Sequence, residues 1–497
     1  MLYTSTRDKS LRVEASEAIT RGISAEGGLF VPCEIPKLSN DDIVSMIPLS
    51  YIDRAKKVLS LYLTDFTPEE IDYCVSGAYR EGKFDSAKVA PLVKLEDKAE
   101  ILELFRGPTC AFKDMALQLL PYLLTTSSKK AAPDKEIVIL VATSGDTGKA
   151  ALEGFKDVSN TRILVFYPEN GVSPMQKLQM TTQEGKNVAV CAIKGNFDDA
   201  QSGVKKIFTD TAVAEKLAAS GMMFSSANSI NWGRLVPQIV YYCSAYCDML
   251  EKGNLTLGEK MNVVVPTGNF GNILAAYYAK LMGIPIGKLI CASNANNVLT
   301  DFLTTGTYDR NRDFYTTMSP SMDILISSNL ERLLFHLSGE NDEQIKELMK
   351  LLSETGKYTV SEDIKTKISE NFAAGFADDV MTSQTIKETY ETDGYLSDTH
   401  TAVAIKVFRD YRQKTGDQTP TVIASTASPY KFAKNVLCAV TGSTPQLDEF
   451  DMALSLEEKT GVKMPSQIRE LKEKEVRFTS VSDVADMEQQ VFDMLGI

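Results

Sequence analysis

The sequence has few of the side chains on which metal enzymes and histidine-dependent nucleophilic enzymes rely. Its 497 residues include only two histidines, His336 and His400, so a zinc site or a Ser-His-Asp or Cys-His mechanism is short of candidates. The eight cysteines are scattered without a CxxC pair and are expected to be reduced, mostly buried thiols. Cys243 and Cys247 lie four apart on an expected helix, where core packing is the favoured interpretation. We therefore expect no metal site.

An excess of positive charge and a long apolar run are missing as well. The formal net charge is -13, whereas nucleic acid or an anionic membrane would need a basic surface, so neither is expected as a partner. No apolar run approaches the roughly 18–20 residues of a membrane span. The first residues, Met1 to Arg7, lack the apolar region of a signal peptide. We expect a cytoplasmic protein with no obligate protein partner, either a monomer or a homodimer.

The length of 497 residues exceeds what one core usually serves, so two or three domains are expected. From about Glu136, apolar strands alternate with helices, which predicts an α/β architecture with right-handed crossovers. The expected strands are 137–141, 162–167, 263–265, 289–292 and 421–424. We expect an N-terminal cap domain at 1–90, a catalytic region at 91–440 and a C-terminal helical element at 441–497. Residues 338–392 are acidic and helix-like, which indicates an insertion packed on the catalytic region.

One lysine is presented in a turn of small residues. The segment is Arg106-Gly107-Pro108-Thr109-Cys110-Ala111-Phe112-Lys113-Asp114, and an apolar helix follows it. A lysine forms an imine only as a neutral amine, which favours partial burial and apolar neighbours such as Phe112. Asp114 is expected to serve the exposed N–H groups at the helix start. Lys113 is therefore a candidate Schiff-base lysine, although an isolated Lys-Asp pair is more often a solvated surface feature.

A glycine loop with the sequence Gly268-Asn269-Phe270-Gly271-Asn272 follows an apolar strand and opens a helix. Such a loop directs several backbone N–H groups at one point, where the helix dipole also favours an anion, and a phosphate suits it best. The alternative is a tight strand-to-helix turn without a ligand.

An earlier loop contains Ser144, Gly145, Asp146, Thr147 and Gly148. It is no nucleotide-binding P-loop, because Thr143 replaces the first glycine and Ala150 the magnesium-binding hydroxyl. Its hydroxyl and N–H groups suit a carboxylate or a second phosphate instead. Together with a reactive lysine and a phosphate loop, it predicts pyridoxal phosphate as cofactor and an amino acid as substrate.

A third element follows the strand 421–424, where ligands of open α/β sheets gather. Thr426 lies there, and its hydroxyl can meet a pyridine nitrogen. On its own this segment would be a hydroxyl-bonded turn or a helix cap.

The ordered set of motifs resembles the longer form of the threonine synthase family, within the fold type II pyridoxal-phosphate enzymes, over nearly the whole chain. The motifs are Tyr3-Thr4-Ser5-Thr6-Arg7, Glu26-Gly27-Gly28-Leu29-Phe30, the lysine turn, 144–148, 195–199, Asn228-Ser229-Ile230-Asn231-Trp232-Gly233-Arg234, 268–272, 319–324, 399–402 and 425–427. The resemblance implies two open twisted-sheet α/β lobes, the smaller at about 115–240, and a helical insertion at about 300–395.

The resemblance also implies roles for particular residues. Lys113 would be the internal aldimine lysine, Gly268 to Asn272 would hold the cofactor phosphate, and Thr426 would face the pyridine nitrogen. Ser144 to Gly148 would meet the acidic groups of the substrate. The implied reaction converts O-phospho-L-homoserine and water to L-threonine and phosphate, by γ-elimination and β-addition of water.

Three positions depart from the family pattern. Arg106 and Ser428 stand where histidine is frequent, and Thr399 stands where proline is frequent. Arg106 is thereby a candidate for added positive charge near the substrate phosphate. Alternative functions are a related lyase that releases a 2-keto acid and an inert relative that serves as a binding protein. A phosphotransferase is disfavoured because the loop at 143–150 does not match a P-loop.

Overall fold

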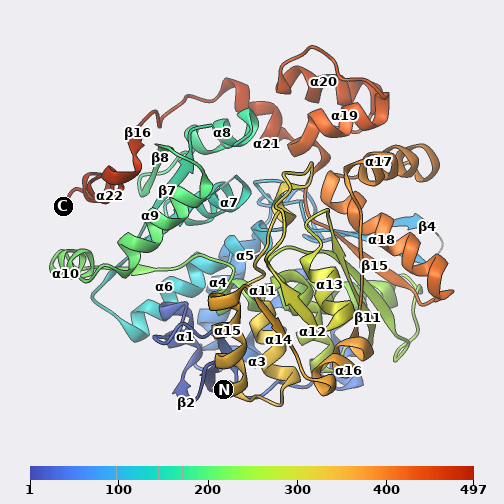
Figure 1. Cartoon of the computed structure of the whole chain (residues 1–497), viewed down its shortest axis with the longest axis horizontal. Helices are drawn as coiled ribbons and strands as arrows, with labels where there is room; N and C mark the ends of the chain where they lie inside the picture. The colour runs from blue at the N-terminus through green and yellow to red at the C-terminus, as the bar shows by residue number, and fades with distance from the viewer. Residues whose placement is uncertain (97, 144, 171) are drawn as a thin grey trace.

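The computed structural model describes residues 1–96, 98–143, 145–170 and 172–497, and the side chain of Asp198 lies outside this description. Two mainly parallel sheets form the centres of two α/β lobes (Figure 1). The larger sheet has the order β14 (Phe372–Phe376), β11 (Ile286–Ser293), β10 (Met261–Pro266), β15 (Thr421–Ser425), β5 (Ala99–Glu103) and β4 (Leu92–Glu96). The smaller has the order β16 (Val481–Asp483), β8 (Val188–Lys194), β7 (Thr161–Pro168), β6 (Glu136–Ala142) and β9 (Met222–Ser225).

The strands of the larger sheet are apolar because helices cover them. Every residue of β10 is buried, as in a parallel strand with both faces packed. β10 pairs in parallel with β11 and with β15, and β15 pairs in parallel with β5; β4 is antiparallel to β5. Carboxyl ends of β5, β10 and β15 therefore meet at one edge, where an open sheet binds its ligands. The helices of this lobe include α12 (Gly271–Met282), α13 (Val298–Thr305) and α18 (Thr399–Thr415).

The smaller lobe alternates strands and helices from β6 to β9. Its strands pair in parallel throughout, including β6 with β7 and β7 with β8. The helices are α7 (Asp146–Phe155), α8 (Pro174–Thr181), α9 (Phe197–Thr209) and α10 (Thr211–Ala219). The two sheets confirm the expected pair of open α/β lobes.

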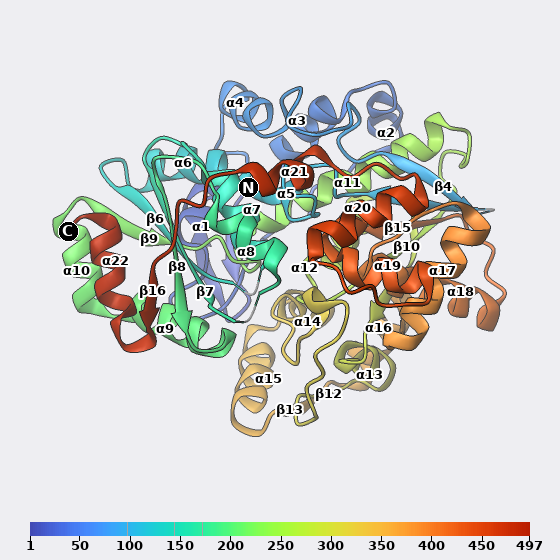
Figure 2. The same ribbon diagram turned by 90° about the horizontal axis from the view of Figure 1, so that it is seen from above.

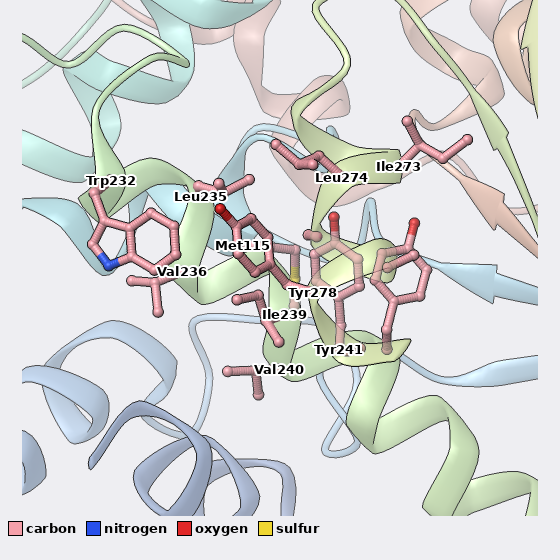
Figure 3. Close-up of a cluster of buried hydrophobic side chains, with 14 of the residues drawn as sticks. Met115, Trp232, Leu235, Val236, Ile239, Val240, Tyr241, Ile273, Leu274 and Tyr278 are labelled. Carbon is pink, nitrogen blue, oxygen red and sulfur yellow. The ribbon is translucent and has the colours of Figure 1, made fainter. Parts of the chain in front are cut away.

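One long buried helix joins the parts of the molecule that surround the site. α11 (Trp232–Glu251) is buried over nearly its whole length and contacts α3 (Tyr51–Tyr62), α5 (Asp114–Leu117) and α12. Figure 3 shows its side chains, among them Leu235 and Ile239, gathered with Met115 of α5 and with Leu274 of α12. The packing of α11 therefore fixes the helix after the lysine turn relative to the helix after the phosphate loop.

The N-terminal segment packs against this central helix and against α6 (Leu120–Ala131). Tyr3 and Tyr62 place their rings 5.4 and 5.6 Å from Trp232 at the start of α11. The segment contains β1 (Tyr3–Ser5), β2 (Asp8–Val13), β3 (Phe30–Pro32), α1 (Ala15–Arg21), α2 (Asn40–Met46), α3 (Tyr51–Tyr62) and α4 (Pro68–Tyr79).

The stretch expected as a helical insertion is mixed. It contains α14 (Leu330–Leu337), α15 (Asp342–Thr355), α16 (Glu362–Asn371) and α17 (Asp379–Asp393), and also β12 (Thr307–Asp309), β13 (Lys357–Thr359) and β14. β14 pairs with β11 and so belongs to the large sheet. Its short, glycine-containing sequence shows little strand periodicity. The pairing with β11, and not a local pattern, places this segment in the sheet.

The C-terminal stretch crosses from one lobe to the other. It contains α19 (Ala433–Thr441), α20 (Glu449–Thr460), α21 (Ser466–Arg469) and α22 (Met487–Leu495), and its strand β16 extends the small sheet beside β8. Figures 1 and 2 both show this red segment leaving the large lobe at α20 and ending at α22 beside α9. Among the described residues, no helix combines the length and the apolar character that crossing a membrane demands.

Candidate active site

The lysine turn is fastened to the segment that follows β15. Phe112 donates its backbone N–H to the carbonyl of Thr426 at 2.8 Å, and Ser428 donates to the carbonyl of Cys110 at 3.0 Å. A bridge between Ala111 and Ala427 completes the pairing. The structure thereby places Lys113 and Thr426 close together, although they are far apart in the sequence.

The Asp114 carboxylate does not serve the N–H groups at the start of the helix, contrary to what was expected from the sequence. Its carboxylate accepts hydrogen bonds from the backbone N–H of Thr109 at 2.8 Å and from the Thr109 hydroxyl at 2.7 Å. Burial raises the pKa of this carboxyl to about 6. A Cβ added to Gly107 would lie 2.6 Å from the Cβ of Asp114, so the turn needs glycine there. Asp114 thus holds the lysine turn closed, a contact that depends on the folded loop and not on the helix.

The Lys113 amine meets the electrostatic conditions for a neutral lysine. Its Nζ lies 5.2 Å from the centre of the Phe112 ring and forms no hydrogen bond or ion pair with any described residue. Burial lowers the pKa of Lys113; Asp146 opposes this, whereas Lys431 and Arg234 lower the pKa further. The amine is therefore surrounded by charges from three other segments.

The loop before α7 is partly engaged with its own residues. The Thr143 hydroxyl accepts from the N–H groups of Gly145 and Gly148, each at 3.0 Å. The N–H groups of Asp146 and Thr147 have no acceptor among the described residues, and they lie in the first turn of α7. An anion can bind at these two groups. Ser144, which belongs to the same expected set, lies outside the described residues.

Asp146 forms an ion pair that links the two lobes. Its Oδ1 lies 2.8 Å from Nζ of Lys431, and the Gln176 amide donates to the same oxygen at 3.2 Å. Lys431 also donates to the Thr109 carbonyl at 2.9 Å. Although burial raises the pKa of Asp146, the neighbouring Lys431 and Lys113 lower it overall. The Asp146 carboxylate is thus committed to Lys431, and its backbone is the part open to an anion.

A cleft of about 750 Å³ reaches this ion pair from the surface. Gln176 and Lys431 line its inner part, and Phe314 and Leu447 are exposed along it. The cleft lies between the two lobes, since Gln176 belongs to the smaller one and Phe314 to the larger one.

The second loop connects β10 to α12, and its backbone enters the left-handed region. Phe270 has φ 62°, and a Cβ added to Gly268 would lie 2.8 Å from the carbonyl oxygen of Ser321. The Gly268 and Asn269 carbonyls accept from the Ser327 hydroxyl at 2.7 Å and from the Asn329 N–H at 3.1 Å. These bonds hold the loop's carbonyls to the 327–329 segment. The start of α12 is left as an anion-binding terminus.

Arg234 was missed as a site residue from the sequence. It is buried on α11, its Nη1 donates to the Ala227 carbonyl, and its Nε has no partner among the described residues. Burial lowers its pKa to about 10, and no described carboxylate pairs with it. A buried cation without a carboxylate partner indicates an anionic ligand. The available signal was an arginine inside the otherwise apolar run Trp232–Val236.

Two other basic residues differ from expectation. Arg106 donates to Glu103 at 2.8 Å and lies 3.5 Å from Asp85, so carboxylates offset its charge. It does not supply the free positive charge that its position suggested. Lys431, which the sequence analysis did not select, is instead buried next to the lysine turn.

Family models match three consecutive stretches of the chain. "Threonine synthase N terminus" matches residues 2–79, "Pyridoxal-phosphate dependent enzyme" matches 88–362, and "Threonine synthase, C-terminal" matches 401–491. The chain is 43% identical to human "Threonine synthase-like 1", with 86% of the chain and 58% of that protein aligned. It thus spans well under two thirds of the length of that relative. It is 38% identical to the threonine synthase of Pseudomonas aeruginosa, with 90% and 92% aligned.

The same family appears among solved structures. The PLP-bound threonine synthase of Brucella melitensis superposes with a TM-score of 0.88 at 37% identity, over 99% of each chain. This agreement extends over both lobes, the N-terminal segment and the C-terminal crossing. The chain therefore belongs to the threonine synthase family of fold type II pyridoxal-phosphate-dependent enzymes.

Proposed function

We propose that the chain is a threonine synthase, which converts O-phospho-L-homoserine and water to L-threonine and phosphate with pyridoxal phosphate as cofactor. The observation that carries the proposal is the environment of the Lys113 amine. An amine with a lowered pKa and no partner among the described residues lies beside Thr426, near two helix N-termini and a buried arginine that pairs with no described carboxylate. A substrate and a cofactor that each carry a phosphate would use both termini and the arginine.

The residues present fit the cofactor. Lys113 would bond to its aldehyde, Gly268 to Asn272 would bind its phosphate, and Thr426 would donate a hydrogen bond to its pyridine nitrogen. The buried Asn272 Nδ2 has no described acceptor, which supports an anion at this loop. When bound, pyridoxal phosphate supplies an electron sink conjugated to the substrate Cα.

The chain's own groups would carry the remaining steps. Lys113 would take one proton from Cα and one from Cβ, and would return one proton to Cγ, which becomes the methyl group of threonine, and one to Cα. Arg234 offsets the charge of the leaving phosphate, which departs with the oxygen bonded to Cγ. The N–H groups of Asp146 and Thr147 hold an acidic group of the substrate in register. A water molecule then adds at Cβ.

Product analysis tests the proposal. The purified protein with pyridoxal phosphate should release threonine and phosphate in equal amounts from O-phospho-L-homoserine, and plain L-homoserine should not react, because it has no phosphate to expel. Phosphate accompanied by 2-oxobutanoate and ammonia in place of threonine would identify a related lyase instead. The cytoplasmic setting and a monomeric or homodimeric state stay predictions from the sequence.

A further inference from the structure

Two tyrosines of α11 meet the side chain of Asn272 at the start of α12. The hydroxyl of Tyr241 lies 2.8 Å from Asn272 Oδ1, and the hydroxyl of Tyr242 contacts the same oxygen. All three residues are buried, and Figure 3 shows Tyr241 among the α11 side chains beside α12. Burial raises the pKa of both tyrosines well above the usual value, so both hydroxyls keep their protons.

This arrangement fixes the rotation of the Asn272 amide. Only the amide oxygen accepts hydrogen bonds, and two hydroxyl groups lie against it, so the nitrogen must face elsewhere. Nδ2 is buried and has no acceptor among the described residues. An amide nitrogen buried without an acceptor is unfavourable unless a ligand supplies one.

A phosphate at the start of α12 is the acceptor that best fits the Asn272 amide nitrogen. Asn272 lies in the first turn of α12, directly after Gly268 to Gly271. If the amide were turned around, its oxygen would be directed at an anion and would repel it. We propose that Tyr241 and Tyr242 are positioning residues, which turn the Asn272 amide so that its nitrogen donates to the cofactor phosphate; this rests on the proposed function.

The same face of α11 extends toward the substrate side of the site. Tyr241 also lies 3.1 Å from the Gln238 amide oxygen, and the Gln238 amide nitrogen donates to the Arg234 carbonyl at 2.7 Å. Residues 234, 238, 241 and 242 have the spacing of one helix face. One rigid helix thus positions the buried arginine and the amide that we assign to the cofactor phosphate.

The test compares two aldehydes that differ only in the phosphate. Apoenzyme carrying Tyr241→Phe or Tyr242→Phe should bind pyridoxal phosphate about two- to tenfold more weakly, the loss expected for one hydrogen bond. Its affinity for pyridoxal, which bonds to Lys113 but has no phosphate, should be unchanged. Tyr246→Phe is the matched control, because Tyr246 lies on the same helix and donates to the Glu259 carbonyl. Its affinities for both aldehydes should equal those of the wild type.

A second variant keeps both tyrosines in place. Asn272→Asp retains an oxygen for the two hydroxyls but replaces the nitrogen with a second oxygen. It should bind pyridoxal phosphate at least about tenfold more weakly and pyridoxal normally, because the amide that donates to the charged phosphate is replaced by a carboxylate that repels it. It also tests the contact if a phenylalanine variant does not fold.

Three results would overturn the inference. Equal losses for both aldehydes would show a purely structural role, and unchanged affinity for pyridoxal phosphate in all variants would show that the amide does not reach the phosphate. If the wild type makes threonine in either case, the proposed function stands without the inference. A wild type in which neither aldehyde bonds to Lys113 would remove the proposed function, and the inference with it.

Discussion

At the residue scale, the pKa of Lys113 is lowered by burial and by neighbours that come from distant parts of the chain. Phe112 is adjacent in sequence, whereas Lys431 lies in the segment after β15 and Arg234 on α11, and the positive charge of each lowers the pKa of the amine. Asp146 opposes their effect, but its carboxylate is paired with Lys431. The balance lowers the pKa of the amine and so favours the neutral form that a covalent catalyst requires.

Lys113→Ala should remove the covalent attachment of the cofactor. Borohydride should fix a pyridoxyl group on Lys113 of the wild type and nowhere in the variant, and turnover should fall by about 10²–10⁴-fold or more. Peptide mapping by mass spectrometry locates the label. Lys83→Ala is the control, because burial lowers the pKa of Lys83 to about 8 as well, while its hydrogen bond to a described residue goes to the Gly77 carbonyl and not to the site. A label on Lys83, or a Lys113→Ala variant with normal turnover, would contradict the assignment.

Thr426 should control the charge of the cofactor ring. Thr426 is a buried residue whose hydroxyl donates to no described residue, so this hydroxyl is available to a ring nitrogen. A hydroxyl cannot neutralise a pyridinium, so Thr426→Asp should favour the protonated ring, change the absorbance of the bound cofactor and depress threonine formation. Thr426→Ser should be mild. Wild-type spectra and turnover in Thr426→Asp, combined with an inactive Thr426→Ser, would place the ring elsewhere.

At the element scale, the lysine turn carries a pH dependence of its own. The folded-state pKa of Asp114 is about 6, above the usual value of 3.8, so the folded state binds more protons than the unfolded state between these values. Stability from this group is therefore present at low pH and lost as the pH rises through about 6.

Asp114→Asn should abolish this component of the pH dependence. The wild type should lose up to about 3 kcal/mol relative to the variant between pH 4 and pH 7, from a shift of about two pKa units. Urea unfolding of both proteins at these two pH values measures the difference. Parallel changes in the two proteins would show that Asp114 titrates normally.

The sequence predicts well where the loops of the site begin and end, but it predicts poorly which residues their side chains contact. Gly268 to Asn272 and the strand before it form a local pattern, and β10 and α12 confirm it. Asp114 was expected to cap a helix, but Thr109 offers it two donors that exist only once the turn is folded. Lys431 lies between Tyr430 and Phe432 in the sequence, but no local pattern identifies its partners, which are the Asp146 carboxylate of the other lobe and the Thr109 carbonyl.

At the scale of the whole molecule, the chain returns to the small lobe at its C-terminal end. Val491 and Phe492 of α22 pack with Phe166 of β7 and Ile193 of β8 in one apolar cluster. β16 pairs with β8 almost 290 residues earlier in the chain. A strand of three residues with such a distant partner has no local signal, which is why a purely helical element was expected at 441–497.

Phe492→Ala should destabilise the small lobe. The ring is buried in this cluster, and its removal should lower the free energy of unfolding by about 3–5 kcal/mol. Thermal melting measures the effect. Leu454→Ala serves as the control, because Leu454 is exposed on α20 and its loss should change stability by no more than about 0.5 kcal/mol. Equal melting temperatures for the two variants would show that the C-terminal crossing does not stabilise the lobe.

The reaction in water enriched in ¹⁸O tests most directly that this site breaks a carbon–oxygen bond and rehydrates the substrate. O-phospho-L-homoserine should yield threonine with ¹⁸O in its hydroxyl group and phosphate without it, because water adds at Cβ and the phosphate leaves with its own bridging oxygen. The Lys113→Ala variant should form neither product. Incorporation of ¹⁸O into the phosphate, with homoserine as the other product, would show cleavage of the phosphorus–oxygen bond and contradict the proposed function.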